Sequence, residues 1–341
     1  MITDARVLRE GFVPGEVVHR DQEVNHLSTV LEPLTRGEPA ETALVTGPSG
    51  AGKTCVSRFT VDRLREAHLD VRAQYVNCWQ NFSRFRVLYR VLEGLGRAVD
   101  VHRQSTPRDE LLERLRDDDG PPCVVVLDEA DQLEDTGVLY DLHRLPGFSM
   151  VLIANREAAV FAGADERLES RLTGSERVPF DRYGLDELVG ILAARAERGL
   201  VPGAVDRAEL ETIADAAAGD ARVAISVLRS AARAAEREGR ERITDDVVAD
   251  AVPRGREAVH RKNLDALTSH QRALYDIVAE RGRIEPSDLY EAYRERVDDP
   301  KTDRTVRNYL QKLAQYDLLE AEGQSRDRVY AVPDDAPTPE A

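Results

Sequence analysis

The sequence predicts an α/β fold built on a parallel sheet, followed by a helical region and a C-terminal winged helix-turn-helix. Two runs, Cys123–Leu127 and Met150–Ala154, are apolar at every position, which is typical of strands buried on both faces of a parallel sheet. Helical stretches alternate with short strands through the first half, as in α/β folds. Beyond about residue 184 the pattern is helical, and the last section reads as three helices and a hairpin.

The individual elements follow from local patterns. Ala43–Thr46 and Val71–Val76 are expected to be strands, and residues 54–67 and 83–98 to be helices. Glycines and amphipathic spacing predict three further helices, at Leu185–Leu200, Arg207–Ala218 and Ala221–Glu238. Pro253 and Gly255 break this pattern and predict the start of a linker.

The C-terminal section has its own capping signals. Ser269, Ser287 and Asp303 can cap helices that run to Arg281, Val297 and Gln315, and strand-like pieces follow at Leu318–Glu320 and Arg328–Val332. The predicted domains are therefore an α/β base at 1–183, a helical lid at 184–255, a winged helix at 261–332 and a disordered, Pro-rich acidic tail at 333–341.

Composition excludes several classes of protein. The 341 residues are 42% hydrophobic with a net charge of −16, so wholesale disorder is excluded. There is no apolar run near the roughly 20 residues of a membrane helix and no secretory signal, so a cytoplasmic, nucleoid-associated protein is expected. Three scattered cysteines argue against a disulfide framework or a Cys-rich zinc site. Only four of the 47 basic residues are lysines, and this acidic, Lys-poor balance favours a protein from a high-salt organism.

A complete phosphate-loop motif, G-x-x-x-x-G-K-[ST], lies between a predicted strand and a predicted helix. Its glycines let backbone N–H groups surround phosphate oxygens at the helix N-terminus. Lys53 is expected to reach the β- and γ-phosphates, and the Thr54 hydroxyl to ligate Mg²⁺. The predicted ATP/ADP-binding residues here are Gly47, Pro48, Ser49, Gly50, Ala51, Gly52, Lys53, Thr54 and Cys55.

Two further strand ends carry polar residues suited to hydrolysis. Asp128 and Glu129 follow the strand Cys123–Leu127. The first carboxylate is expected to hold Mg²⁺, and the second to act as general base toward the attacking water. Asn155 follows Met150–Ala154 and is expected to orient that water. Of the many arginines, Arg222 could report the γ-phosphate to the lid, and Arg171 could be a finger toward a neighbouring subunit.

The ordered set of motifs resembles AAA+ ATPases, and among them the archaeal replication initiators related to the origin recognition complex. The matching pieces, which with the C-terminal section span nearly the whole chain, are VPGEVVHRDQEV (13–24), TGPSGAGKT (46–54), YVNC (75–78), VVVLDEADQL (124–133), VLIANR (151–156), ERLESRLTGSERVPFDRY (166–183), ELVGILAAR (187–195) and GDARVAI (219–225).

The resemblance implies further roles. Val13, Pro14, His19 and Arg20 resemble a segment that flanks the adenine, and Tyr183 and Arg195 resemble nucleotide-contacting positions of the lid. It also makes Asn155 the first sensor, Arg222 the second and Arg171 the finger. Between Cys78 and Cys123, where relatives carry a DNA-contacting insertion, this chain has no clear motif; Arg84, Arg86 and Arg103 are the candidates there.

The third C-terminal helix has the side chains of a DNA-recognition helix. An apolar face is formed by Val306, Tyr309, Leu310 and Leu313. Another face carries base-reading side chains, and the flanks carry cations for phosphates. The predicted DNA-binding residues are Lys301, Arg304, Arg307, Asn308, Gln311, Lys312, Arg326 and Arg328.

The sequence thus predicts an ATP-gated initiator that binds double-stranded DNA at replication origins and acts with the replicative helicase. Self-association on DNA is possible, and a membrane is not a partner. ATP binding and slow hydrolysis would act as a switch. Three alternatives stay open: a transcriptional regulator that senses nucleotide, a clamp-loader-like ATPase acting on protein, and a non-initiating paralogue.

Overall fold

The computed structural model describes residues 1–102, 105–161, 166–323 and 328–333. It divides into two compact units. The sheet unit comprises Arg9–Arg195 and Ala218–Ala221, and the helical unit comprises Met1–Leu8, Ala196–Ala217 and Arg222–Ala341. This division into two units differs from the predicted base, lid and winged helix, whose boundaries stay a prediction.

The sheet unit alternates strands and helices along the chain. In order, its elements are α1 (Asp21–Leu31), η1 (Glu32–Arg36), β1 (Ala43–Thr46), α2 (Lys53–Ala67), β2 (Arg72–Asn77), α3 (Arg84–Gly94), α4 (Arg108–Arg116), β3 (Cys123–Asp128), η2 (Ala130–Gln132), α5 (Gly137–His143), β4 (Phe148–Ala154), α6 (Glu157–Phe161), α7 (Glu166–Leu172), β5 (Glu176–Pro179) and most of α8 (Leu185–Gly199).

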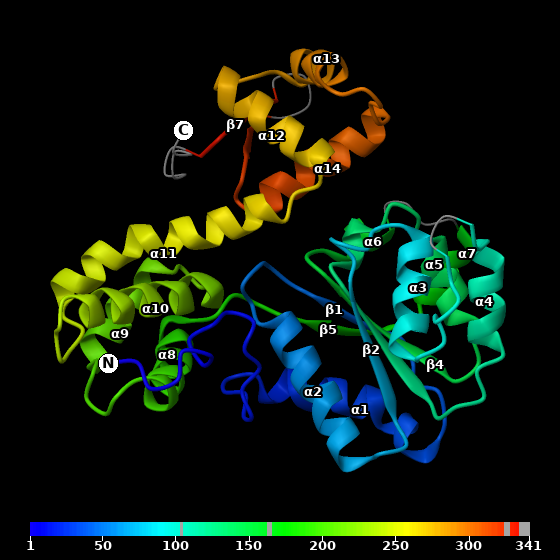
Figure 1. Ribbon diagram of the computed structural model, residues 1–341, viewed down its shortest axis with the longest axis horizontal. Helices are drawn as coiled ribbons and strands as arrows, with labels where there is room; N and C mark the ends of the chain where they lie inside the picture. Colours follow the sequence, from blue (N-terminus) through cyan, green and yellow to red (C-terminus); the bar gives the residue numbers. More distant parts are fainter. Residues whose placement is uncertain (103–104, 162–165, 324–327, 334–341) are drawn as a thin grey trace. The chain divides into compact units, whose positions relative to one another are not determined.

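The five strands pair in the order β2-β3-β4-β1-β5, and every pairing is parallel. Helices cover both faces of this sheet, as Figure 1 shows. Because β1, β3 and β4 are neighbours, their carboxyl ends meet at one edge. The residues that follow these strands include the predicted phosphate loop, Glu129 and Asn155, so the predicted site is assembled there.

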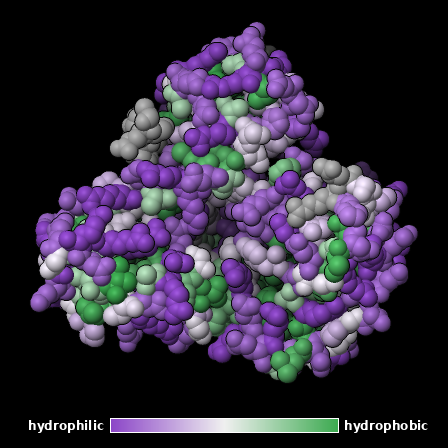
Figure 2. Space-filling view, viewed as in Figure 1, coloured by the Kyte–Doolittle hydropathy of each residue, from purple (hydrophilic) through white to green (hydrophobic). Residues whose placement is uncertain are grey.

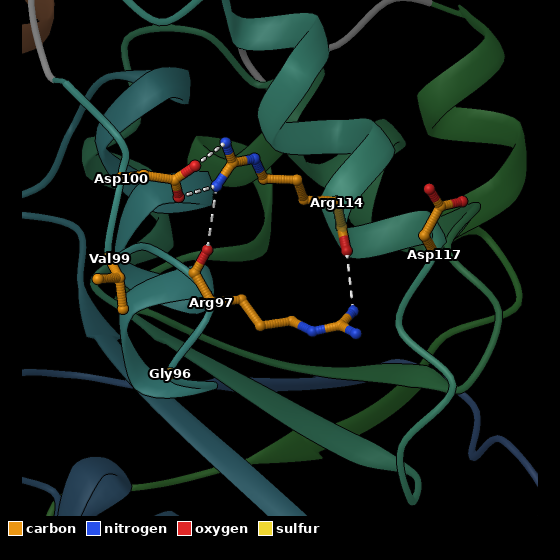
Figure 3. A pocket seen from close by; sticks show the side chains of 6 residues that line it. All are labelled: Gly96, Arg97, Val99, Asp100, Arg114 and Asp117. Atoms are coloured by element: carbon orange, nitrogen blue, oxygen red, sulfur yellow. Dashed lines mark hydrogen bonds and ion pairs between the residues drawn. The ribbon is translucent and has the colours of Figure 1, made fainter.

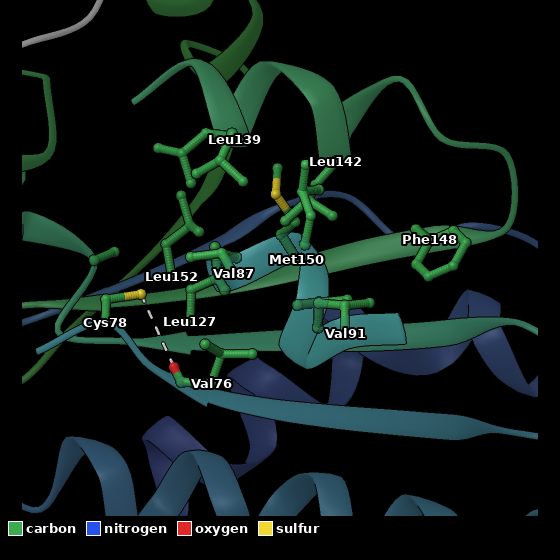
Figure 4. Close-up of a cluster of buried hydrophobic side chains, with 14 of the residues drawn as sticks. Val76, Cys78, Val87, Val91, Leu127, Leu139, Leu142, Phe148, Met150 and Leu152 are labelled. Atoms are coloured by element: carbon green, nitrogen blue, oxygen red, sulfur yellow. Dashed lines mark hydrogen bonds between the residues drawn. The ribbon is translucent and has the colours of Figure 1, made fainter. Parts of the chain in front are cut away.

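Alternate residues of each central strand enter two different cores. Val124 and Val126 of β3 pack on the side of α1 and α2. Val125 and Leu127 pack on the opposite side, with Val87 of α3 and leucines of α5; Figure 4 shows this second core. Both faces are buried, which explains the unbroken apolar runs in the sequence.

The helical unit contains two successive groups of elements. After the end of α8, its helices and strands are α9 (Arg207–Ala216), α10 (Ala221–Arg237), α11 (Asp245–Asp265), α12 (Ser269–Arg281), α13 (Pro286–Arg296), α14 (Asp303–Gln315), β6 (Glu320–Glu322) and β7 (Val329–Ala331). Ala221, the first residue of α10, belongs to the sheet unit. β6 and β7 pair antiparallel. The order of α12 to β7 is that of a winged helix-turn-helix.

Pro253 does not begin a linker, contrary to the sequence prediction, because α11 continues through it. The proline is exposed, and so is Ala249, whose carbonyl loses its helical partner, so water can satisfy that carbonyl. Gly255 has a packing role. A Cβ at this position would lie 2.5 Å from Val227 of α10, so glycine lets the two helices approach closely.

Other boundaries also differ from the prediction. β5 was not expected, because Val178 is its only buried residue and it lies at the sheet edge. The helix expected over 83–98 ends at Gly94, and Gly96 adopts φ +74° just beyond it. Two C-terminal caps lie one residue earlier than expected, at Thr268 and Thr302.

The surface of the molecule is polar. Hydrophilic residues dominate the face of the molecule in Figure 2, in agreement with a content of 32% charged residues. Within the residues that the structure describes, no helix is both long and apolar enough to span a bilayer.

Candidate nucleotide and nucleic-acid sites

The phosphate loop connects β1 to α2 in a conformation that needs glycine. Gly47, Gly50 and Gly52 have φ of +151°, +75° and +91°, which side chains with a Cβ rarely adopt. A Cβ on Gly47 would lie 2.2 Å from the carbonyl oxygen of Phe180. Phe180, the residue just after β5, therefore limits the shape of the loop.

Two other groups approach the loop as closely. A Cβ on Gly52 would lie 2.2 Å from the Tyr183 hydroxyl, and one on Gly50 would lie 2.1 Å from Oδ1 of Asp220. The backbone N–H of Ala221 also donates to the carbonyl of Gly50, at 3.2 Å. Asp220 was not predicted as a site residue, because its place beside Gly50 depends on tertiary structure.

Lys53 lies at the centre of the site, as its motif predicts. Its side chain is only 8% exposed. Its Nζ donates to the carbonyl oxygens of Gly47 at 2.6 Å and Pro48 at 2.7 Å, and to Oδ1 of Asn155 at 3.1 Å. The phosphate-loop lysine and the polar residue after β4 are thus in direct contact.

Thr54 and Asp128 also meet. The Thr54 hydroxyl lies 2.9 and 3.1 Å from the two carboxylate oxygens of Asp128. A second hydroxyl, that of Tyr75 on β2, donates to Oδ2 of the same carboxylate. A hydroxyl and a carboxylate supply the hard oxygen ligands that Mg²⁺ requires, so these residues fit the predicted metal position.

Burial and hydrogen bonding act on Asp128 in opposite directions. Its burial raises the pKa of the carboxyl group, while hydrogen bonds from Tyr75 and Thr54 and the charge of Lys53 lower it. The neighbouring Glu129 has φ +58°, a rare conformation for a residue with a side chain. Its backbone N–H donates to Oδ1 of Asp128 at 3.0 Å. Such a backbone at a strand end is typical of a functional position.

Arg20 and Tyr183 form a stacked pair beside the phosphate loop. The guanidinium carbon lies 4.1 Å from the centre of the tyrosine ring. Arg20 also donates to Glu23 and to the carbonyl of Asp181, both at 2.7 Å. Burial raises the pKa of Tyr183, and the Arg20 charge opposes this. Arg20 therefore holds Tyr183 against Gly52 within the sheet unit.

The segment around Val13 and Pro14 is held by Arg195 of α8. The Arg195 guanidinium donates to the carbonyl oxygens of Arg9, at 3.3 Å, and Phe12, at 3.0 Å. It also lies 5.0 Å from the centre of the Phe12 ring. This arginine organises the segment that the resemblance places against the adenine.

His19 and Cys55 complete the surroundings of this region. His19 has φ +62° and packs on α8, where a Cβ on Gly190 would lie 2.2 Å from its Nε2. Burial raises the pKa of the Cys55 thiol, while the charges of Arg195 and Arg58 lower it.

Arg171 lies on α7 with an exposed side chain. Its guanidinium is 5.2 Å from the ring centre of Tyr140 on α5, and that of Arg144 is 5.4 Å from the same ring. Burial lowers the pKa of His143, and the charge of Arg171 lowers it further. Arg222, the predicted second sensor, belongs to α10 and to the helical unit.

A hollow of about 420 Å³ lies between the segment that follows α3 and the end of α4 (Figure 3). It is lined by Gly96, Arg97, Val99, Asp100, Arg114 and Asp117. Arg114 is paired with Asp100 at 2.6 Å. Arg84, a candidate for DNA contact, is bound to Asp141 through two hydrogen bonds of 2.5 and 2.6 Å. These pairings compete with phosphate binding in the region after Cys78. Arg103 lies outside the described residues.

The face of α14 that was predicted to read DNA is exposed. Val306 and Leu310 are buried in the winged helix, as the apolar spacing predicts. The four side chains expected to reach bases are on the exposed face: Arg304, Arg307, Asn308 and Gln311.

The basic residues predicted to contact phosphates are less exposed or already paired. Lys312 is only 3% exposed, so the prediction that it contacts phosphate is wrong for this structure, because its position on α14 faces the domain interior. Lys301 pairs with Asp299 at 3.1 Å. Burial raises the pKa of Tyr330 on β7, and the nearby Arg328 lowers it. Arg326 lies outside the described residues.

Comparisons with known proteins agree with this geometry. Residues 36–170 match the family described as an AAA domain, and residues 189–252 match the Cdc6 AAA+ ATPase-type lid domain. The fold, the phosphate loop and the polar strand ends therefore define the chain as an AAA+ ATPase.

Two relatives that align over most of the chain identify its family within the AAA+ ATPases. The chain is 58% identical to ORC1-type DNA replication protein 9 of Halobacterium salinarum, over 98% of this chain and 94% of that protein. It is 52% identical to ORC1-type DNA replication protein 1 of the same organism, over 90% of this chain and all of that protein. The chain belongs to the family of ORC1-type DNA replication proteins.

Solved structures show the same fold. The Aeropyrum pernix ORC1 protein, solved in complex with DNA, is 28% identical with a TM-score of 0.77, covering 98% of this chain and 94% of that one. The Aeropyrum pernix ORC2 protein, solved as ADPNP-ADP complexes, is 24% identical with a TM-score of 0.68, covering 99% and 95%.

Proposed function

We propose that this chain is an ATP-dependent initiator that recognises origins of chromosomal replication and helps to load the replicative helicase. The observation that carries the proposal is the joint placement of Lys53, Asn155, Thr54 and Asp128 at one sheet edge. The chain that supplies this site also belongs to a family of DNA replication proteins.

The phosphate loop offers the means to hold ATP. The glycine conformations expose loop N–H groups, and Lys53 can exchange its carbonyl partners for phosphate oxygens. Thr54 and Asp128 would hold Mg²⁺. When bound, Mg²⁺ neutralises charge on the phosphate oxygens and so favours attack on the γ-phosphate.

Glu129 would take the proton of the attacking water, and Asn155 would orient that water. Hydrolysis serves as a slow reset of a binding switch in this proposal. Arg222 would report the γ-phosphate, and Arg171 would reach the nucleotide of a neighbouring copy on DNA. These two roles rest on the resemblance of their motifs, GDAR and ESRL.

The DNA reader would be α14. Its exposed arginines can bind guanine, and its Asn308 and Gln311 can bind adenine, from the major groove. Phosphate contacts weaken steeply as salt rises. An acidic chain of this family with Halobacterium relatives would therefore depend more on base contacts than on phosphate contacts.

Footprinting on DNA fragments selected by binding to the wild-type protein tests the DNA reader. Replacing Arg304 and Arg307 by Ala should weaken the sequence-specific footprint at least about tenfold, since each good base contact contributes about 1–3 kcal/mol. The double variant Arg272→Ala, Arg281→Ala removes the same charge from α12 and serves as the control. Equal loss in both variants would contradict base reading by α14.

A second candidate is a role other than initiation. One organism, Halobacterium salinarum, has at least two ORC1-type proteins, which are 58% and 52% identical to this chain. One of several copies can act as a nucleotide-sensing transcriptional regulator or a non-initiating paralogue. Chromatin capture of the protein separates the two functions. Enrichment at origins supports the initiator, and enrichment at scattered promoters supports the regulator.

A further inference from the structure

Tyr75 reaches the catalytic edge from a strand that carries none of the predicted site residues. It lies on β2, which pairs with β3 so that Tyr75 is opposite Val126 and Asn77 is opposite Asp128. Its hydroxyl donates to Oδ2 of Asp128. The residue is 41% exposed, so its side chain does not belong to the hydrophobic core on this face of the sheet.

The other hydrogen bonds of Asp128 indicate what the Tyr75 hydroxyl does. The carboxylate is buried, and among the described residues it also accepts hydrogen bonds from the Thr54 hydroxyl and from the backbone N–H of Glu129. Both of those residues have their own expected roles in hydrolysis. Tyr75 has none, so its hydroxyl can hold the carboxylate in one rotation while the others act.

The tyrosine ring also contacts helix α2. The guanidinium carbon of Arg58 lies 5.2 Å from the ring centre, within the range of a cation–π contact. Arg58 belongs to α2, the helix that begins at Lys53. The orientation of Tyr75 is thus tied to the helix that carries Lys53 and Thr54, as well as to β3.

We propose that Tyr75 is a positioning residue for the divalent metal ion: its hydroxyl fixes the Asp128 carboxylate in the orientation that holds Mg²⁺ beside Thr54. This inference rests on the proposed nucleotide-binding function and deepens it. Residues that orient metal ligands in this way typically change metal affinity about 10- to 100-fold when they are removed.

The test compares Tyr75→Phe with the wild type by calorimetry and by hydrolysis. Phenylalanine keeps the ring under Arg58 and removes only the hydroxyl. The control is Tyr89→Phe, which removes a hydroxyl that donates to Glu93 at 3.1 Å on the surface of α3. ADP binding is measured in EDTA and across a Mg²⁺ titration, and the Mg²⁺ dependence of ATP hydrolysis is measured alongside.

The expected result is a Mg²⁺ requirement raised about tenfold in Tyr75→Phe, for both ADP binding and hydrolysis, with unchanged ADP binding in EDTA. Tyr89→Phe should match the wild type. Arg58→Gln, which loosens the ring but leaves the hydroxyl, should shift the Mg²⁺ requirement in the same direction by less.

Two results would overturn the inference in different ways. If the Mg²⁺ requirement of Tyr75→Phe equals that of the wild type, or if ADP binding in EDTA weakens as much as binding in Mg²⁺, Tyr75 has only a structural role and the nucleotide site itself stands. If the folded wild type takes up no ADP under either condition, the proposed function fails together with the inference.

Discussion

Replacing Gly47 by Ala tests the idea that Phe180, the residue just after β5, shapes the phosphate loop. At φ +151° a side chain costs about 1–3 kcal/mol of backbone strain. The new Cβ would lie 2.2 Å from the Phe180 carbonyl oxygen and 3.0 Å from its carbonyl carbon, both in the backbone. Moving Phe180 would also weaken its 2.7 Å hydrogen bond to Thr46, which contributes about 0.5–1.5 kcal/mol.

The free energy of unfolding should therefore fall by about 2–4 kcal/mol in Gly47→Ala. Gly37→Ala is a matched control, because Gly37 also has positive φ (+78°) but a Cβ there would have nothing within 4 Å. Its cost should be about 1–2 kcal/mol, from the backbone alone.

Urea denaturation at constant high salt measures both variants. The chain's single tryptophan, Trp79, is buried in the sheet unit, so its fluorescence reports unfolding of that unit. The midpoint should fall further for Gly47→Ala than for Gly37→Ala with little change in slope. Equal midpoints for the two variants would refute the proposed contact with Phe180.

Two further predictions concern the chemistry of the sheet unit. Lys53→Ala should abolish ATP binding, whereas Glu129→Gln should keep ATP binding and slow phosphate release at least about 100-fold. Hydrolysis by Glu129→Gln at the wild-type rate would exclude Glu129 as the general base. Arg171→Ala should raise the pKa of His143 in an NMR titration, because it removes a nearby positive charge. Because the folded-state pKa of His143 is lowered, its contribution to stability is full above about pH 6.5 and is lost as the pH falls from that value through the lower folded-state pKa. An unchanged pKa of His143 in Arg171→Ala would show that the two side chains do not interact.

Much of the sheet and the chemical core of the site could be predicted from sequence. Strands with unbroken apolar runs, such as Cys123–Leu127, are buried on both faces, and the sequence shows this directly. The motifs place Lys53 at the β- and γ-phosphates and Asn155 at the attacking water, and the two side chains lie 3.1 Å apart. β5 was missed because an edge strand with one buried residue has no such pattern.

The supporting contacts of the site could not be predicted in this way. Tyr75 reaches Asp128 across a strand pairing, and Asp220 reaches Gly50 from a distant part of the chain. Neither contact leaves a local signature in residue spacing. At Pro253 the local pattern instead predicted a break that does not occur. Helix α11 continues through this proline, because the residue lies on its exposed face.

Calorimetric titration of the folded protein with ATP in Mg²⁺, beside the Lys53→Ala variant, tests the central claim most directly. The account predicts one binding site per chain in the wild type and no measurable binding in Lys53→Ala. Binding of equal strength in both proteins, or no binding in a wild type whose Trp79 shows a cooperative urea transition, would contradict it.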